Sequence, residues 1–223
     1  MPDSLPLAGL DAVLLDVDGT LVDTTYLHAC LWADAFAEHG HPLPTADLHA
    51  LVGKDSEGLV RTALSDVEVA DQLVDELTNS HAERYEPHWP RLRPLPGARL
   101  LLKALKESGR SVVLSTSASA KELEALRAAL DADAFVDGAT SADDAAAGKP
   151  APDLLQAALR VAGAPADRAL LVGDSVWDAE GARRAGMGFV GVTSGGIPEA
   201  LLREAGARSV YANAAELCAH LEV

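Results

Sequence analysis

The chain has 223 residues, 48% of them hydrophobic, which is enough to bury one sizeable core or a core with a small second domain. Its 34 acidic residues outnumber 18 basic ones and give a net charge of −16. This balance argues against binding to nucleic acid, whose phosphates attract Lys and Arg, and against adhesion to anionic membranes.

The first predicted element is a buried strand, and the elements that follow it are helical. The apolar segment 12–16 (AVLLD) indicates the strand. A helical pattern then continues to Gly40, a residue that commonly ends helices, and Thr45 is placed as the N-cap of a second helix. Further helical segments reach Tyr85. Four prolines within 87–96 predict a stiff connector after them.

After residue 96, apolar strand patterns alternate with helical ones. Such alternation predicts a parallel sheet with helices on both faces, joined by right-handed crossovers. We therefore predict an α/β fold: a Rossmann-like, doubly wound parallel sheet core at 1–21 and 94–223, with a small α-helical cap domain inserted at 22–93. The later strands are predicted at 111–116, 134–138, 169–174 and 188–192.

Polar residues gather where these strands end. Asp16 and Asp18 end the first strand, and Thr116 and Asp174 end two later ones. Open α/β sheets bind ligands at the carboxyl ends of their strands. Carboxylates on one rim repel one another unless a cation lies among them, and oxygen ligands without His or Cys suit Mg²⁺. The alternative is that each Asp caps a following helix, but capping does not explain two carboxylates separated by a single valine.

Four short segments follow one another along the chain: DVDGTLVD (16–23), LSTSAS (114–119), GKPAPD (148–153) and GDSVWD (173–178). In this order they resemble the four motifs of the haloacid dehalogenase-like superfamily. Each motif is short, but together and in this context they are specific. The position of the helical insert, directly after the first motif, resembles the branch that contains phosphoglycolate phosphatases and β-phosphoglucomutases.

The resemblance implies a role for each matching carboxylate. Asp16 matches the nucleophile, which would form an aspartyl-phosphate. Asp18 matches the general acid and base. Asp16, the backbone carbonyl of Asp18, and Asp174 would hold Mg²⁺, with Asp178 behind them as an outer-shell partner of the metal.

The resemblance also implies groups that bind the phosphoryl oxygens or the substrate. Thr116 would donate its hydroxyl, Ser117 its backbone N–H, and Lys149 a fixed positive charge. Lys54, in the segment 51–59, would reach a second anionic group of the substrate. Purely structural alternatives stay open for four of these residues. Thr116 could be a helix cap, and its register within the motif is uncertain by one residue. Lys149 could be a solvated loop lysine, Asp178 a surface residue and Lys54 an exposed lysine at a helix start.

These residues predict a Mg²⁺-dependent phosphatase that hydrolyses small phosphate monoesters through an aspartyl-phosphate. Asp18 favours this activity, because dehalogenases of the family lack an acid/base Asp there. The alternatives are a β-phosphoglucomutase-like sugar phosphomutase and a non-catalytic module that binds phosphorylated metabolites. The insert holds six of the seven histidines, in no recognised metal-ligand spacing, and the sequence leaves open which of them face the substrate.

The remaining expectations concern partners and location. The predicted partner is a small phosphorylated metabolite, and we expect no binding to nucleic acid or membrane. The protein itself is expected to be a monomer or a homodimer. Cys30 and Cys218 stand in no disulfide or zinc pattern, and no segment resembles a signal peptide or a membrane span. We therefore expect a cytoplasmic protein.

Overall fold

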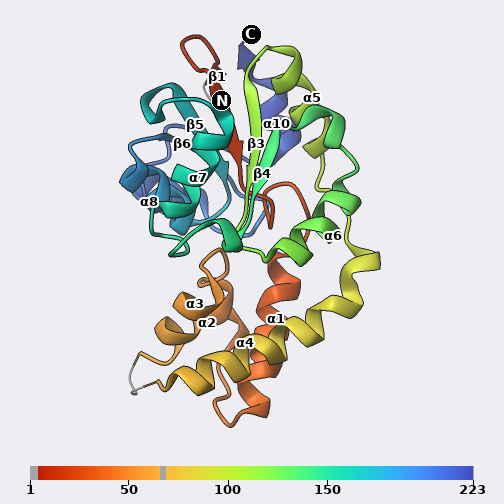
Figure 1. The fold of residues 1–223 in the computed structure, drawn as a ribbon, viewed down its shortest axis with the longest axis vertical. Coiled ribbons are helices and arrows are strands. Elements are labelled where there is room, and N and C mark those ends of the chain that lie inside the picture. The colour runs from red at the N-terminus through yellow and green to blue at the C-terminus, as the bar shows by residue number, and fades with distance from the viewer. Residues whose placement is uncertain (1–4, 66–68, 223) are drawn as a thin grey trace.

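The protein consists of an α/β core and a helical cap at one end of it (Figure 1). A computed structural model describes residues 5–65 and 69–222. At the end of the core remote from the cap, the short strands β1 (Leu5–Pro6) and β8 (Leu221–Glu222) pair in parallel, so the two ends of the described chain lie side by side. Within the described ranges, no helix has both the length and the apolar character needed to cross a bilayer.

The core is a six-stranded sheet in the order β4-β3-β2-β5-β6-β7, with every neighbouring pair parallel. From the inner strand β2 the chain builds outward to β3 and β4, then crosses back to continue through β5, β6 and β7. The strand order therefore reverses at β2, which is where such sheets bind ligands. The strands are β2 (Ala12–Leu15), β3 (Ser111–Ser115), β4 (Gly138–Thr140), β5 (Ala169–Gly173), β6 (Gly188–Val192) and β7 (Val210–Tyr211).

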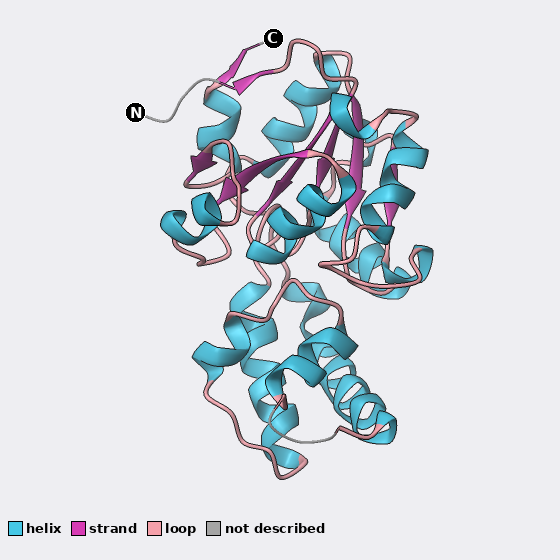
Figure 2. Cartoon of the chain, turned by 90° about the vertical axis from the view of Figure 1, so that its left-hand side faces the viewer, coloured by secondary structure: helices cyan, strands magenta, loops and turns pink. Residues whose placement is uncertain are grey.

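Helices cover both faces of the sheet, as Figure 2 shows, and the predicted doubly wound fold is confirmed. Alternation along β2 explains the two layers: Val13 and Leu15 pack into one apolar cluster, and Leu14 packs into another on the opposite face. The first cluster contains α5 (Ala98–Glu107), α6 (Ala120–Leu130) and α10 (Ala214–Ala219); the second contains α7 (Asp153–Ala162), α8 (Val176–Ala185) and α9 (Glu199–Glu204).

The cap has a hydrophobic core of its own. Buried residues from all four cap helices, among them Trp32, Phe36, Leu48 and Leu77, form a cluster separate from the two around the sheet. A unit that buries its own apolar residues is expected to keep its shape when it moves as a whole. The cap helices are α1 (Thr25–Glu38), α2 (Thr45–His49), α3 (Ser56–Ala63) and α4 (Asp71–Tyr85), followed by a 3₁₀ helix, Glu86–Arg91.

The chain leaves and re-enters the core along two neighbouring segments. The backbone N–H of Asp23 donates to the carbonyl of Arg93 at 3.0 Å, and that of Leu95 donates to the carbonyl of Leu21 at 2.8 Å. Two hydrogen-bonded connections are a natural place for one domain to move against another. The assignment of 22–93 to the cap and of 1–21 and 94–223 to the core stays a prediction.

Two local predictions are wrong. The strand predicted at 134–138 is a 3₁₀ turn, Asp133–Phe135, and β4 starts only at Gly138, opposite Val113. Asp131 ends α6 in the left-handed region, with φ 47°. The apolar residues Phe135 and Val136 in the segment after it pack against the core before the strand pairing of β4 begins. Thr45 is the first residue of α2 and not its N-cap, which is Pro44 and makes no side-chain cap.

Candidate active site

Three of the predicted site residues follow neighbouring strands at one edge of the sheet. Asp16 follows β2, Thr116 follows β3 and Asp174 follows β5. Since β2 lies between the other two strands in register, their carboxyl ends meet. All three residues are buried. The structure thus brings together the rim that the sequence predicts.

Lys149 lies at the centre of this rim. Its Nζ is 2.5 Å from Oδ1 of Asp16 and 2.7 Å from Oδ1 of Asp178, and it donates to the carbonyl of Ser115 at 3.3 Å. Burial by itself would lower the pKa of Lys149, but the two carboxylates outweigh it and raise that pKa. With 1% of its surface exposed, Lys149 is not a solvated loop lysine. It is a buried cation shared by two acids.

Asp178 is equally buried, and both oxygens of its carboxylate have partners. Its Oδ2 accepts hydrogen bonds from the hydroxyl of Ser175 at 2.6 Å and from the backbone N–H of Ser175 at 3.1 Å. The backbone N–H of Asp178 in turn donates to the Ser175 hydroxyl at 3.1 Å, which completes the capping box of α8. Its other oxygen faces Lys149. The alternative of a surface residue is therefore wrong, whereas its outer-shell role at a metal stays a prediction.

The same edge of the sheet carries more negative charge than Lys149 can offset. Carboxylate oxygens of Asp16, Asp174 and Asp178 lie within 4.8 Å of one another. Burial raises the pKa of Asp174 well above its usual range, and the charges of Asp16 and Asp178 add to this effect. Burial also raises the pKa of Asp16 to about 7. A cluster of oxygen donors with excess negative charge fits a divalent cation.

Asp18 stands beside this cluster and is held by two hydroxyl groups. Thr24 donates to its Oδ1 at 2.7 Å, and Thr116 donates to its Oδ2 at 3.0 Å. Burial would raise the pKa of Asp18, but His28 and the two threonines outweigh it and lower that pKa. Thr116 is not the N-cap of α6; Ser119 is, accepting a hydrogen bond from the backbone N–H of Glu122.

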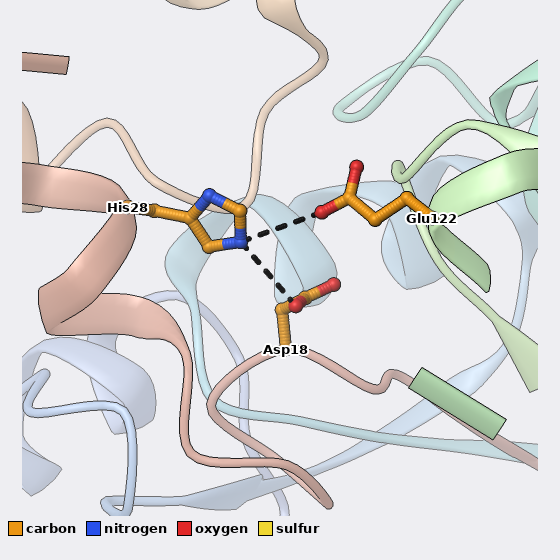
Figure 3. Close-up of side chains that lie close together, drawn as sticks. All are labelled: Asp18, His28 and Glu122. Atoms are coloured by element: carbon orange, nitrogen blue, oxygen red, sulfur yellow. Dashed lines mark ion pairs between the residues drawn. The ribbon is translucent and has the colours of Figure 1, made fainter. Parts of the chain in front are cut away.

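A histidine of the cap joins Asp18 to a second acid of the core (Figure 3). Nε2 of His28, on α1, lies 3.5 Å from Oδ1 of Asp18 and 3.6 Å from Oε1 of Glu122, on α6. Burial raises the pKa of Glu122 to about 7. Burial would lower the pKa of His28, but its two acidic neighbours outweigh this and raise that pKa. His28 is thus a contact between cap and core at the reactive edge, and its acidic neighbours favour its protonated form.

These groups open onto a cavity of about 420 Å³ between core and cap. Asp16, Asp18, Thr116 and Ser117 line its core side. The cap side includes a cluster of aromatic rings, and two of the six insert histidines, which the sequence could not single out, lie in it: His28 and His81. Nδ1 of His28 and Nε2 of His81 are 3.1 Å apart, and His81 stacks on Trp32 with ring centroids 4.1 Å apart.

The cap segment 51–59 lies against the same edge of the sheet. Ser117 donates to the carbonyl of Gly53 at 3.4 Å, and the indole N–H of Trp177 donates to the carbonyl of Ala50 at 3.1 Å. Lys54 lines the cavity, but its Nζ lies 4.1 Å above the Trp177 ring and donates to Thr62 at 2.9 Å. Burial lowers the pKa of Lys54. Its contact with substrate stays a prediction.

Comparison with known proteins decides the family. The family model described as haloacid dehalogenase-like hydrolase matches residues 10–186. The chain belongs to this family. A phosphoglycolate phosphatase from Caulobacter vibrioides is 33% identical to it over 190 residues, which cover 82% of this chain and 79% of the relative.

Solved structures share the whole architecture. A hydrolase from Pseudomonas syringae is 33% identical, with a TM-score of 0.85 over 94% of this chain and 97% of its own. A protein from Bacteroides vulgatus described as a putative beta-phosphoglucomutase reaches a TM-score of 0.83 at 21% identity, covering 94% of this chain and 86% of its own, which shows the fold alone. The predicted haloacid dehalogenase-like hydrolase with a helical cap is confirmed.

The sequence does not reveal every residue of the site. It marks Glu122 only as part of a helical pattern, and Thr20, which donates to Oδ1 of Asp174 at 3.0 Å, only as part of the first motif. Glu122 is in the first turn of α6, directly after the predicted Thr116 and Ser117, so its place near the rim could have been suspected. Its pairing with His28 depends on how the cap docks, which no local pattern encodes.

Proposed function

We propose that the chain is a Mg²⁺-dependent phosphatase that hydrolyses small phosphate monoesters through an aspartyl-phosphate. One observation carries the proposal: Asp16, bound by the buried Lys149, and Asp18, bound by Thr116, line the same cavity between core and cap. A nucleophile and an acid/base group on one cavity are what two-step phosphoryl transfer requires.

In the first step, a carboxylate oxygen of Asp16 attacks phosphorus and the bond from phosphorus to the leaving oxygen breaks. Asp18 gives its proton to that oxygen; the negative charge of an incoming phosphate favours the protonated form. In the second step, Asp18, whose own environment lowers its pKa, takes a proton from water as the water attacks phosphorus. Inorganic phosphate leaves and Asp16 is regenerated. Lys149 keeps a positive charge beside Asp16 throughout.

The donor set of buried carboxylates fits Mg²⁺. Asp16, Asp174 and the backbone carbonyl of Asp18 would hold the ion, and Asp178 would support them through Lys149 and Ser175. When bound, the ion would neutralise charge on the phosphoryl oxygens. Thr116 and the backbone N–H of Ser117 would bind the same oxygens.

Phosphate release from an aryl phosphate tests this proposal. We expect turnover with Mg²⁺, none in excess chelator, and recovery when Mg²⁺ is added back. Ca²⁺ should inhibit, because it takes more ligands and would engage both oxygens of the nucleophile. Full activity in chelator would contradict the metal requirement. Lack of turnover on any phosphate ester would favour the non-catalytic binding module.

The phosphomutase alternative needs its own measurement, because it uses the same four motifs. With a sugar phosphate as substrate, the phosphatase should release inorganic phosphate in proportion to substrate consumed. A mutase would convert the substrate into its positional isomer with little phosphate released. The proposed substrate is a small phosphorylated metabolite, and a cytoplasmic monomer or homodimer remains the prediction.

A further inference from the structure

The cap side of the cavity carries a cluster of aromatic rings among apolar, polar and acidic side chains. Trp32, His81, Tyr85 and Trp89 line it, and the Tyr85 ring lies 4.2 Å from that of His28. Aromatic walls bind ligands that offer an apolar face. At about 420 Å³ the cavity falls within the range of pockets for drug-sized ligands and exceeds what a two-carbon phosphate fills.

The charged groups around this wall are mostly acidic. Besides Asp16 and Asp18, four carboxylates line the cavity, whereas its described lining contains two lysines and no arginine. Both lysines are engaged: Nζ of Lys121 is 2.7 Å from Glu86, and Lys54 contacts Thr62 and Trp177. The four further carboxylates are those of Asp55, Glu57, Glu86 and Glu122.

The two histidines of the wall do not supply a free positive charge. His28 lies between Asp18 and Glu122. Burial lowers the pKa of His81 well below its usual range, so its ring is neutral. Lys54 pairs with no carboxylate of the described residues, but the charge of the adjacent Asp55 acts on it. A distal carboxylate or second phosphate of a substrate would therefore meet more acidic than basic groups among the described lining residues, and like charges placed face to face disfavour binding.

The hydrogen-bonding character of the wall points the same way. Ionised carboxylates only accept hydrogen bonds, whereas hydroxyl groups both donate and accept. In the described part of the chain, the hydroxyl of Tyr85 and the indole N–H of Trp89 are buried without a hydrogen-bond partner. A ligand hydroxyl beside either group would satisfy it, and other hydroxyls could donate to Asp55 or Glu122.

We propose that the distal part of the substrate is an uncharged polyol with an apolar face, as in a sugar or cyclitol monophosphate, and that the cap discriminates against a distal carboxylate. This rests on the proposed phosphatase activity and narrows its substrate class. The chain would thereby differ in preference from relatives named for phosphoglycolate.

A matched series of two-carbon phosphates tests the charge preference. We would compare kcat/KM for 2-hydroxyethyl phosphate, phosphoglycolate and phosphoethanolamine, which differ only in the distal group, and add glucose 6-phosphate for the ring. We expect glucose 6-phosphate to have the highest kcat/KM of the four. The kcat/KM for phosphoglycolate should be at least about tenfold lower than that for 2-hydroxyethyl phosphate. A preference for phosphoglycolate, or a strong preference for phosphoethanolamine, would overturn the proposal that the distal part of the substrate is an uncharged polyol. Lack of turnover on all four and on an aryl phosphate would overturn the phosphatase activity itself.

Two variants, each with a matched control, locate the preference in the cap. Asp55→Asn should raise kcat/KM for phosphoglycolate relative to 2-hydroxyethyl phosphate, whereas Asp47→Asn, at an exposed position outside the cavity, should not. Tyr85→Phe should raise KM for glucose 6-phosphate with little change for 2-hydroxyethyl phosphate, and Tyr26→Phe, exposed and outside the cavity, should change neither. Unchanged ratios in both cavity variants, with native folding by circular dichroism, would contradict the proposal.

Discussion

The core and the cap enclose one cavity with walls of different kinds. On the core side, charged groups bind one another at the ends of parallel strands, as Lys149 binds Asp16 and Asp178. On the cap side, rings pack against rings: His81 stacks on Trp32, which belongs to the cap's own apolar cluster. From this difference we infer that residues at the sheet edge carry out the reaction, whereas residues of the insert determine which substrate is preferred.

Several side chains connect the two walls, and among the described residues of 22–93 both Thr24 and His28 contact the reactive group Asp18. His28 is the one of these two that also pairs with Glu122. It is carried by the cap but contacts Asp18 and Glu122 of the core. Substitutions in the core should therefore fail on every substrate, substitutions in the cap should change the preference among substrates, and His28 should fall between them.

The largest effect is expected for Asp16→Asn. The amide cannot attack phosphorus, so no phosphoenzyme should form and turnover of every substrate should fall to background. Phosphate release, together with acid trapping of labelled enzyme, checks this. Unfolding temperature and circular dichroism serve as controls for the fold, and near-normal turnover in a folded variant would show that Asp16 is not the nucleophile.

Asp18→Asn should fail differently. It keeps the nucleophile and the backbone carbonyl, but it removes the proton donor and the base, which typically costs ~10²–10⁴-fold. Aryl phosphates, whose leaving groups need less protonation, should lose less than alkyl phosphates in the first step. Phosphoenzyme should accumulate, because the water of the second step is no longer activated. Equal losses on all leaving groups would remove the assigned acid role.

His28→Asn should have a smaller effect on all substrates. The variant removes the imidazole that contacts Asp18 and Glu122, and misplacing a reactive group can cost roughly 10- to 100-fold in rate. We expect kcat to fall similarly for aryl and sugar phosphates. His41→Asn, in the cap but outside the cavity, is the matched control. A change confined to KM for one substrate would instead make His28 a specificity residue.

The smallest effect is expected for Lys54→Ala. A lysine away from the reacting atoms should contribute to binding of a remote group, so KM for the true substrate should rise a few-fold with little change on an aryl phosphate. Lys103→Ala, an exposed core lysine, is the control. An equal loss of kcat on both substrates would place Lys54 in the catalytic machinery, on the core side of the division.

Local sequence pattern is sufficient for β2, β3, β5 and β6 and for the reactive edge, whereas β4 was misplaced and β7 was not predicted. Whether a segment such as 12–15 becomes a buried strand is largely a property of its own residues, and parallel strands bring their carboxyl ends to one edge. Asp16, Thr116 and Asp174 can therefore be placed together from the amino-acid sequence. Their motif context also identifies the family, although their catalytic roles still await the substitutions above.

Only the tertiary structure decided what faces this edge. The start of β4 depends on which residue lies opposite Val113, and the sequence alone misplaced it at 134–138. His28 and Glu122 meet because a helix of the insert docks on a helix of the core, and contacts between residues so distant in the chain leave no periodic pattern. The aromatic wall arises in the same way, since its rings come from separate helices that share a face only after the cap has folded and docked.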